Sequence, residues 1–180
     1  MPYLHDFEGL HGVTKEQVFV FWTSNLRETM GDKRWLETCN STGFYLARVL
    51  SHFSLQSTDS AEALSPDYSP GEEELRAFAD LTQIAEMLMT SLRDAKNPRW
   101  MESAGAHILL HAGFFYSQNK RRRDIPFFSE KGRECYMMAA MGKRGKTMEL
   151  VARRFDEHLF HFTRLHKHLE EKRYLINVEH

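Results

Sequence analysis

The stretch Trp100–Asn119, W-M-E-S-A-G-A-H-I-L-L-H-A-G-F-F-Y-S-Q-N, decides the fold class, because its apolar residues do not keep to one side. On a helix, at about 100° per residue, its Ile, Leu, Phe and Tyr side chains point all round the cylinder. A helix that is apolar on every side is a buried one. The stretch carries two histidines and is too short to span a bilayer. The sequence therefore predicts a buried central helix over about 99–118 of an all-α protein.

Composition is that of an ordinary globular domain. The 180 residues are enough to bury a core, and 42% apolar with 27% charged residues is a typical balance. A formal net charge of −1 gives no global field that favours nucleic acid or an anionic membrane. Two cysteines make no disulfide framework, and we expect neither a signal peptide nor a membrane-spanning run from the apolar pattern. We therefore expect a cytoplasmic protein without membrane contact.

Capping signals and helical periodicity predict five more helices around the central one. Thr14 followed by Gln17 is a capping-box pattern, and Asp32 is the expected N-cap of the next helix, whose apolar stripe includes Leu36. The expected ranges are about 15–30, 33–54, 72–96, 127–141 and 147–172. The last helix is the most regular, and its stripe holds Val151, Phe155, His158, Leu159, Phe162, Leu165 and Leu169. We expect a single-domain bundle of about six helices.

The clearest break in the pattern lies at about 55–71, where Ser, Asp, Pro and Gly dominate. Residues 55–74 carry six acidic residues and no Lys or Arg. Because each side of the break is too small to bury much core alone, we expect a mobile acidic loop inside one domain.

Three segments resemble the motifs of a family of uncharacterised bacterial all-helical proteins. They are Y-L-A-R-V-L-S-H-F at 45–53, S-A-G-A-H-I-L-L-H-A-G-F-F at 103–115 and F-F-S-E-K-G-R-E-C-Y-M-M-A-A at 127–140. The resemblance covers roughly residues 40–165, with Ala106 where the family usually has Asp. It implies a helical fold and a bacterial origin. The family has no assigned activity, so no catalytic residue carries over.

Histidines form the first candidate site, since ten occur in the chain. His107 and His111 are four residues apart and so share one helix face, about 6 Å apart. If the last helix packs against the central one, His158 and His161 converge on that pair, and helical bundles build di-iron, zinc or haem sites in this way. A buried histidine hydrogen-bonded to a carbonyl or carboxylate explains the same residues, because no H-E-x-x-H or paired E-x-x-H motif is present.

The second candidate, A-M-G-K-R-G-K-T at 140–147, fits a relaxed Walker A pattern. A phosphate loop needs a buried strand before it and a sheet to hold it, and the preceding residues instead read as helix. A glycine-bounded connection between two helices, with Thr147 as N-cap, is the favoured interpretation.

The third candidate is a basic segment at 120–146, with nine Lys/Arg and three Asp/Glu and a local charge of +6. The expected partner-binding residues are Lys120, Arg121, Arg122, Arg123, Lys143 and Arg144. Nucleic acid is not the expected partner, because the chain is neutral overall and has no helix-turn-helix or zinc-finger signature. The segment instead suits an acidic protein surface, or the acidic loop of the same chain or of a second copy.

No catalytic motif is present, and Cys39 and Cys135 are interpreted as small core residues. We therefore expect a non-enzymatic interaction or regulatory module. The expected partner is a second copy, as a homodimer, or another protein. Nine methionines and the aromatic helices at 15–30 and 127–141 offer adaptable contact surface. The alternative is a metal- or haem-binding bundle with iron, zinc or haem held by the histidines.

Overall fold

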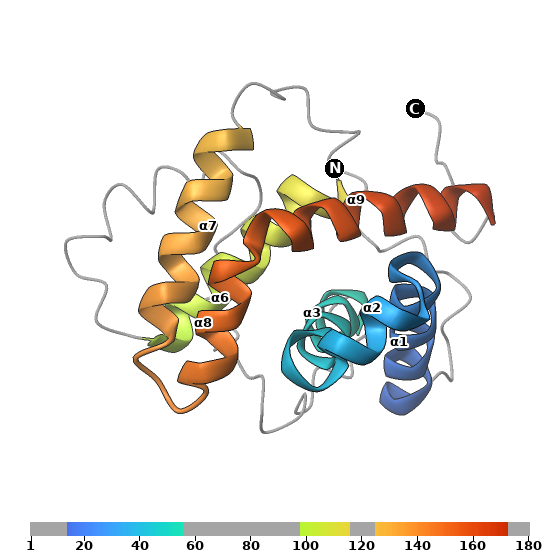
Figure 1. The fold of residues 1–180 in the computed structure, drawn as a ribbon, viewed down its shortest axis with the longest axis horizontal. Coiled ribbons are helices and arrows are strands. Elements are labelled where there is room, and N and C mark those ends of the chain that lie inside the picture. The colour runs from blue at the N-terminus through green and yellow to red at the C-terminus, as the bar shows by residue number, and fades with distance from the viewer. Residues whose placement is uncertain (1–13, 56–97, 116–124, 173–180) are drawn as a thin grey trace. The chain divides into compact units, whose positions relative to one another are not determined.

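The computed structural model describes residues 14–55, 98–115 and 125–172, and throughout these ranges the chain is helix or turn, which confirms the all-α prediction. The elements are α1 (Lys15–Met30), α2 (Asp32–Thr38), the π-helical turn η2 (Cys39–Gly43), α3 (Phe44–Leu55), α6 (Pro98–Leu109), the π-helical turn η3 (Leu110–Phe114), α7 (Ile125–Ala139), α8 (Gly145–Arg153) and α9 (Phe155–Glu171) (Figure 1).

The chain divides into two compact units. Of the described residues, 14–55 and 164–172 belong to the first unit, and 98–115 and 125–163 belong to the second. The expected acidic loop and the expected helix at 72–96 lie outside the described residues, and a single-domain arrangement stays a prediction. In the described part of the chain, no helix is both long and apolar enough to cross a membrane.

Helix α1 begins and ends as the sequence predicts. The Thr14 hydroxyl accepts from the Gln17 amide at 3.2 Å, and the Thr14 amide donates to the Gln17 side chain at 2.8 Å, which completes a capping box. Gly31 ends the helix at φ 85°, a left-handed value that a residue without Cβ adopts at little cost.

A π-helical turn interrupts the second predicted helix. Its first segment starts at Asp32 with Gly31 as N-cap, so the expected cap at Asp32 is wrong by one residue. Leu36, expected in the apolar stripe, is 74% exposed, whereas Trp35 is buried at 6%. The wider turn η2 shifts the helical phase between α2 and α3, so a stripe drawn at a uniform 100° per residue places Leu36 on the wrong face.

The first unit packs α1 against α3. The indole N–H of Trp22 donates to the Ser54 hydroxyl at 2.8 Å, a buried contact between residues far apart in sequence. Around it lie the fully buried Leu26, Leu46 and Leu50. The unit also joins α1 to the end of α9, where the Lys172 ammonium donates to Glu28 at 2.6 Å.

Helix α6 lies at the centre of the second unit. Every residue from Met101 to Leu110 is buried, which confirms that the most apolar stretch of the sequence is a buried helix. Gly105 allows the close approach of α7, because a Cβ added there would lie 2.9 Å from the Tyr136 ring.

Helix α7 packs against α6 and α8 (Figure 1). Its Gly132 faces the ring of Phe155, the first residue of α9, so closely that a Cβ on Gly132 would overlap the ring. The rings of Tyr136 and Phe155 are themselves in contact, with centroids 5.9 Å apart. The two aromatic rings thus fill notches that glycines leave in the facing helices.

The last predicted helix, at 147–172, is two helices. Arg154 has φ −110° and ψ 21° and separates α8 from α9. The apolar stripe from Val151 to Leu169 is buried both before and after Arg154. The spacing of the apolar residues therefore does not indicate that the helix ends there. The N-cap of α8 is Arg144, with no side-chain capping bond, and the expected N-cap at Thr147 is therefore wrong.

His52 on α3 makes the stability of the first unit depend on pH. Burial lowers the pKa of His52 from 6.5 to about 4. Between these values the unfolded chain binds more protons, so the free energy of unfolding falls as pH drops from 6.5 to 4 and is undiminished above 6.5. The shift corresponds to about 3 kcal/mol.

We predict that His52→Gln, whose side chain is polar but does not titrate, reduces the fall in the free energy of unfolding between pH 6.5 and 4 by about 3 kcal/mol. Urea unfolding of both proteins at several pH values from 7 to 4 measures it. Identical slopes for the two proteins would show that His52 does not carry the effect.

Candidate functional site

His107 and His111 lie side by side on the central helix, as their spacing predicts. Their ring centroids are 6.3 Å apart and the ring planes differ by 13°. Phe115 continues the row, with its ring 6.0 Å from that of His111. Ser103, one turn before His107, is fully buried on the same face. The row holds two parallel imidazoles, one buried and one half-buried.

His158 and His161 lie on α9 in the same unit as that pair. His158 is buried in the apolar stripe, as expected. His161 and His166 on the same helix are also buried. His161 Nε2 lies 3.5 Å from Glu157 Oε1, so the nearest described carboxylate is on its own helix. Among residues 14–55, 98–115 and 125–172, no group of three or more His, Cys, Asp or Glu is placed to hold one metal ion.

The π-helical turn η3 connects the histidine helix to α9. A Cβ on Gly113 would lie 2.9 Å from Phe162 Cβ, so only glycine fits without movement. The Thr163 hydroxyl donates to the Gly113 carbonyl at 3.0 Å. Single π turns often occur at functional sites. No sequence pattern marked this one, because an i→i+5 turn leaves the composition of a helix unchanged.

The turn that resembles a Walker A loop is a helix connection. The amides of Ala140, Met141, Gly142 and Gly145 donate to carbonyls of the preceding residues at 3.0–3.2 Å. A phosphate loop needs such amides to point at its ligand. A Cβ on Gly145 would overlap the Ala140 carbonyl oxygen, so the glycine is explained by the tight turn. The residues therefore serve chain reversal between α7 and α8.

Arg144, one of the expected partner-binding residues, forms an ion pair within the chain. Its Nη2 donates to both carboxylate oxygens of Glu102 on α6, at 2.8 and 2.9 Å. Glu102 is buried and Arg144 half-buried, so the pair is shielded from solvent and fixes the turn on the central helix.

Much of the basic charge after residue 125 is also paired inside the chain. Three ion pairs hold it: Lys131 with Glu134 at 2.7 Å, Arg133 with Asp156 at 3.1 Å, and Arg153 with Glu149 at 2.5 Å. Lys143 and Lys146 are exposed, and within the described ranges neither has an acidic group in ion-pair distance. Lys120 and Arg121 to Arg123 lie outside the described residues.

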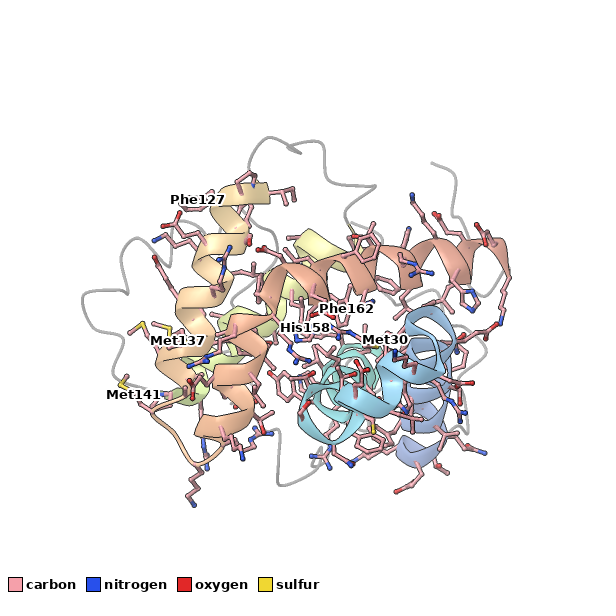
Figure 2. All side chains as sticks on the ribbon, in the orientation of Figure 1. Met30, Phe127, Met137, Met141, His158 and Phe162 are labelled. Atoms are coloured by element: carbon pink, nitrogen blue, oxygen red, sulfur yellow. The ribbon has the colours of Figure 1, made fainter. Side chains whose placement is uncertain are left out.

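Exposed methionines lie at the C-terminal end of α7 and just beyond it, within the segment 127–141 that the sequence indicates as a contact surface. Met137 and Met141 are 49% and 71% exposed, and Phe127 at the other end of α7 is 36% exposed. Figure 2 shows Met137 and Met141 projecting together from the C-terminal end of α7. Methionine is usually a core residue, so its exposure is visible only once the packing of α7 is known.

The cysteines behave as small core residues in the structure. Cys135 is buried, and this burial raises the pKa of its thiol to about 12, so almost no thiolate forms at neutral pH. The half-buried Cys39 thiol donates to the Leu36 carbonyl at 3.8 Å. Neither geometry is that of an activated nucleophile.

A scan against models of known protein families found no match, and neither did searches of curated proteins and of solved structures. This outcome agrees with a resemblance confined to a family without assigned activity. Function is therefore inferred from the side chains themselves.

We predict that Arg144→Ala destabilises the second unit by about 2 to 4 kcal/mol, because it removes both hydrogen bonds to a buried carboxylate. Lys143→Ala, next in the chain but exposed, is the matched control, with an expected effect within about 0.5 kcal/mol. Urea unfolding of the three proteins measures the difference. Equal stabilities of the two variants would mean that the ion pair with Glu102 is not structural.

Proposed function

We propose that this protein is a non-enzymatic interaction or regulatory module, and that the outer side of α7 is its contact surface. The observation that carries the proposal is the pair of exposed methionines, Met137 and Met141, one helical turn apart. Single exposed apolar side chains are common on protein surfaces and need no explanation. Two flexible thioethers together form an apolar spot that adapts to a partner.

The pattern of exposure along α7 supports this assignment. After Pro126 in the first turn, its exposed residues recur every three or four positions and form one stripe: Phe127, Glu130, Arg133, Met137 and, just past the helix end, Met141. Glu130 and Arg133 lie in the middle of the stripe, and the apolar spot of Met137 and Met141 lies beside them at one end. An apolar centre beside polar groups is the usual make-up of a protein–protein contact. The proposed partner is a second copy of the chain, as a homodimer, or another protein.

A metal or haem centre is the alternative, with His107, His111, His158 and His161 as ligands and iron, zinc or haem as the occupant. The observation in its favour is the parallel pair of imidazoles on α6 and η3. Two histidines at i and i+4 chelate a transition metal from one helix face. A metal centre of this kind requires the α9 histidines to complete the ligand set.

The alternative predicts near-stoichiometric metal, or a haem absorption band, in freshly purified untagged protein, and its loss in His107→Ala/His111→Ala. His168→Ala, a half-buried histidine of the first unit, is the control and retains the metal. Elemental analysis and an absorption spectrum measure both. Metal-free, colourless wild-type protein whose unfolding does not respond to chelator would retire this alternative.

For the proposed function, Met141→Glu is expected to abolish co-purification of the native partner, because it places a charge in the apolar spot. Leu36→Glu is a closely matched control: Leu36 is 74% exposed against 71% for Met141, and it lies on another helix. Each tagged protein is expressed at its native level, and the stoichiometry of associated protein, including a second copy of the chain, is measured. A partner that both variants retain, or both lose, contradicts the assignment to α7.

A further inference from the structure

Basic residues follow the two methionines in the chain, and the acidic residue just before them, Glu134, is paired with Lys131. From Cys135 to Met148 the sequence contains no Asp or Glu and three basic residues, Lys143, Arg144 and Lys146. Arg144 is held by Glu102, so it adds little net charge. Lys143 and Lys146 remain exposed, with no acidic group of the described residues in ion-pair distance. Two ammonium groups that no described carboxylate pairs with therefore follow the methionines in the chain.

We propose that this surface, formed by Met137, Met141, Lys143 and Lys146, binds an acidic amphipathic helix of a partner protein. The proposal rests on the interaction function proposed above and specifies the chemistry of the partner. The apolar stripe of the partner helix lies on the two thioethers. Its carboxylates lie at one end of that stripe, against the two lysines.

The spacing of the four residues suits a helix better than an extended strand. Met137 lies on α7 and Met141 four residues later, just past the helix end, and an amphipathic helix offers apolar side chains at intervals of three, four and seven residues. Lys143 and Lys146 follow just past the helix end, so the positive charge lies at one end of the apolar spot. This asymmetry fixes the direction of a partner whose acids are clustered at one of its ends.

The start of α8 adds to the positive potential without forming a site of its own. The helix begins at Gly145 with no side-chain capping bond and no acidic residue in its first turn, so its N-terminal amides favour negative charge. Lys146 lies in this first turn. Carboxylates approaching Lys146 therefore meet a favourable backbone field as well as the ammonium charge.

Nucleic acid and anionic membranes fit the same residues less well. Two unpaired lysines release few counterions from a phosphate backbone, and thioethers offer no flat ring on which bases stack. Farther along α7 the exposed stripe carries Glu130, which repels phosphates and anionic lipid headgroups. A partner with its acids at one end avoids this carboxylate.

Two synthetic 18-residue helical peptides with the same leucine stripe test the proposal. One carries glutamates at one end of its polar face, and the other carries lysines at the same positions. Full-length protein labelled with ¹³C at the methionine methyl groups is titrated with each, and the signals of Met137 and Met141 are identified from Met→Leu variants. The acidic peptide is expected to shift these two signals saturably, and the basic peptide to leave them in place.

Charge variants of the full chain separate a local effect from net charge. Lys143→Glu/Lys146→Glu is expected to lower the affinity for the acidic peptide by about tenfold or more. The affinity of the wild-type chain for this peptide is expected to fall as the salt concentration rises. Lys33→Glu/Lys167→Glu makes the same change in net charge at exposed lysines elsewhere and is expected to bind as wild type does.

Three outcomes would overturn the proposal. The first is equal binding of both peptides, or equal loss in both charge variants, since charge at this surface would then not select the partner. The second is stronger displacement of the methionine signals by oligonucleotide or anionic vesicles. The third is tighter binding by a peptide of residues 55–74, which would make the chain its own ligand. If Met141→Glu still abolishes native association, the contact surface stands and only the acidic chemistry fails.

Discussion

The packing of the second unit depends on two positions where helices approach so closely that only glycine fits. Gly105 receives the ring of Tyr136, and Gly132 receives the ring of Phe155. The two rings also contact each other, so α7 is fixed against α6 on one side and against the first turn of α9 on the other. Packing of this kind tolerates almost no rotation of α7 about its axis, because a rotated helix would bring a Cβ into a ring.

A fixed rotation of α7 decides which of its residues face outward. With Gly132 and Tyr136 turned inward, Met137 and, beyond the helix end, Met141 are turned outward. Burial of a methionine side chain stabilises the folded state by about 1.5 to 3 kcal/mol. Met137 and Met141 do not contribute this stabilisation in full, because they are exposed. The packing of the unit places these two positions outside but does not require that they be methionines. A contact with another molecule that covers them recovers the lost burial.

Sequence reasoning succeeded where a property depends on a few neighbouring residues. The capping box of Thr14, the burial of the most apolar stretch and the distance between His107 and His111 all follow from spacing within one helix. It failed where one residue changes the phase of a helix. Because the π turn η2 changes the helical phase, Leu36 faces outward and not into the core. The break at Arg154 between α8 and α9 leaves the spacing of the apolar residues unchanged. Hydrophobic periodicity averages over several turns, so neither event changes it enough to be seen.

The charge of the basic segment shows the same limit for a functional site. A count along the sequence gives +6 between Lys120 and Lys146, but an ion pair removes a cation from this total when its acid lies elsewhere in the chain. Arg144 is neutralised by Glu102, which lies 42 residues earlier in the chain. The sequence around Arg144 gives no indication of this ion pair. Only tertiary structure separates a basic residue that holds the fold from one left for a ligand. Of the expected partner-binding residues that the structure describes, Lys143 alone has no acidic partner among the described residues, and Lys146, which was not among the expected partner-binding residues, lies three positions later.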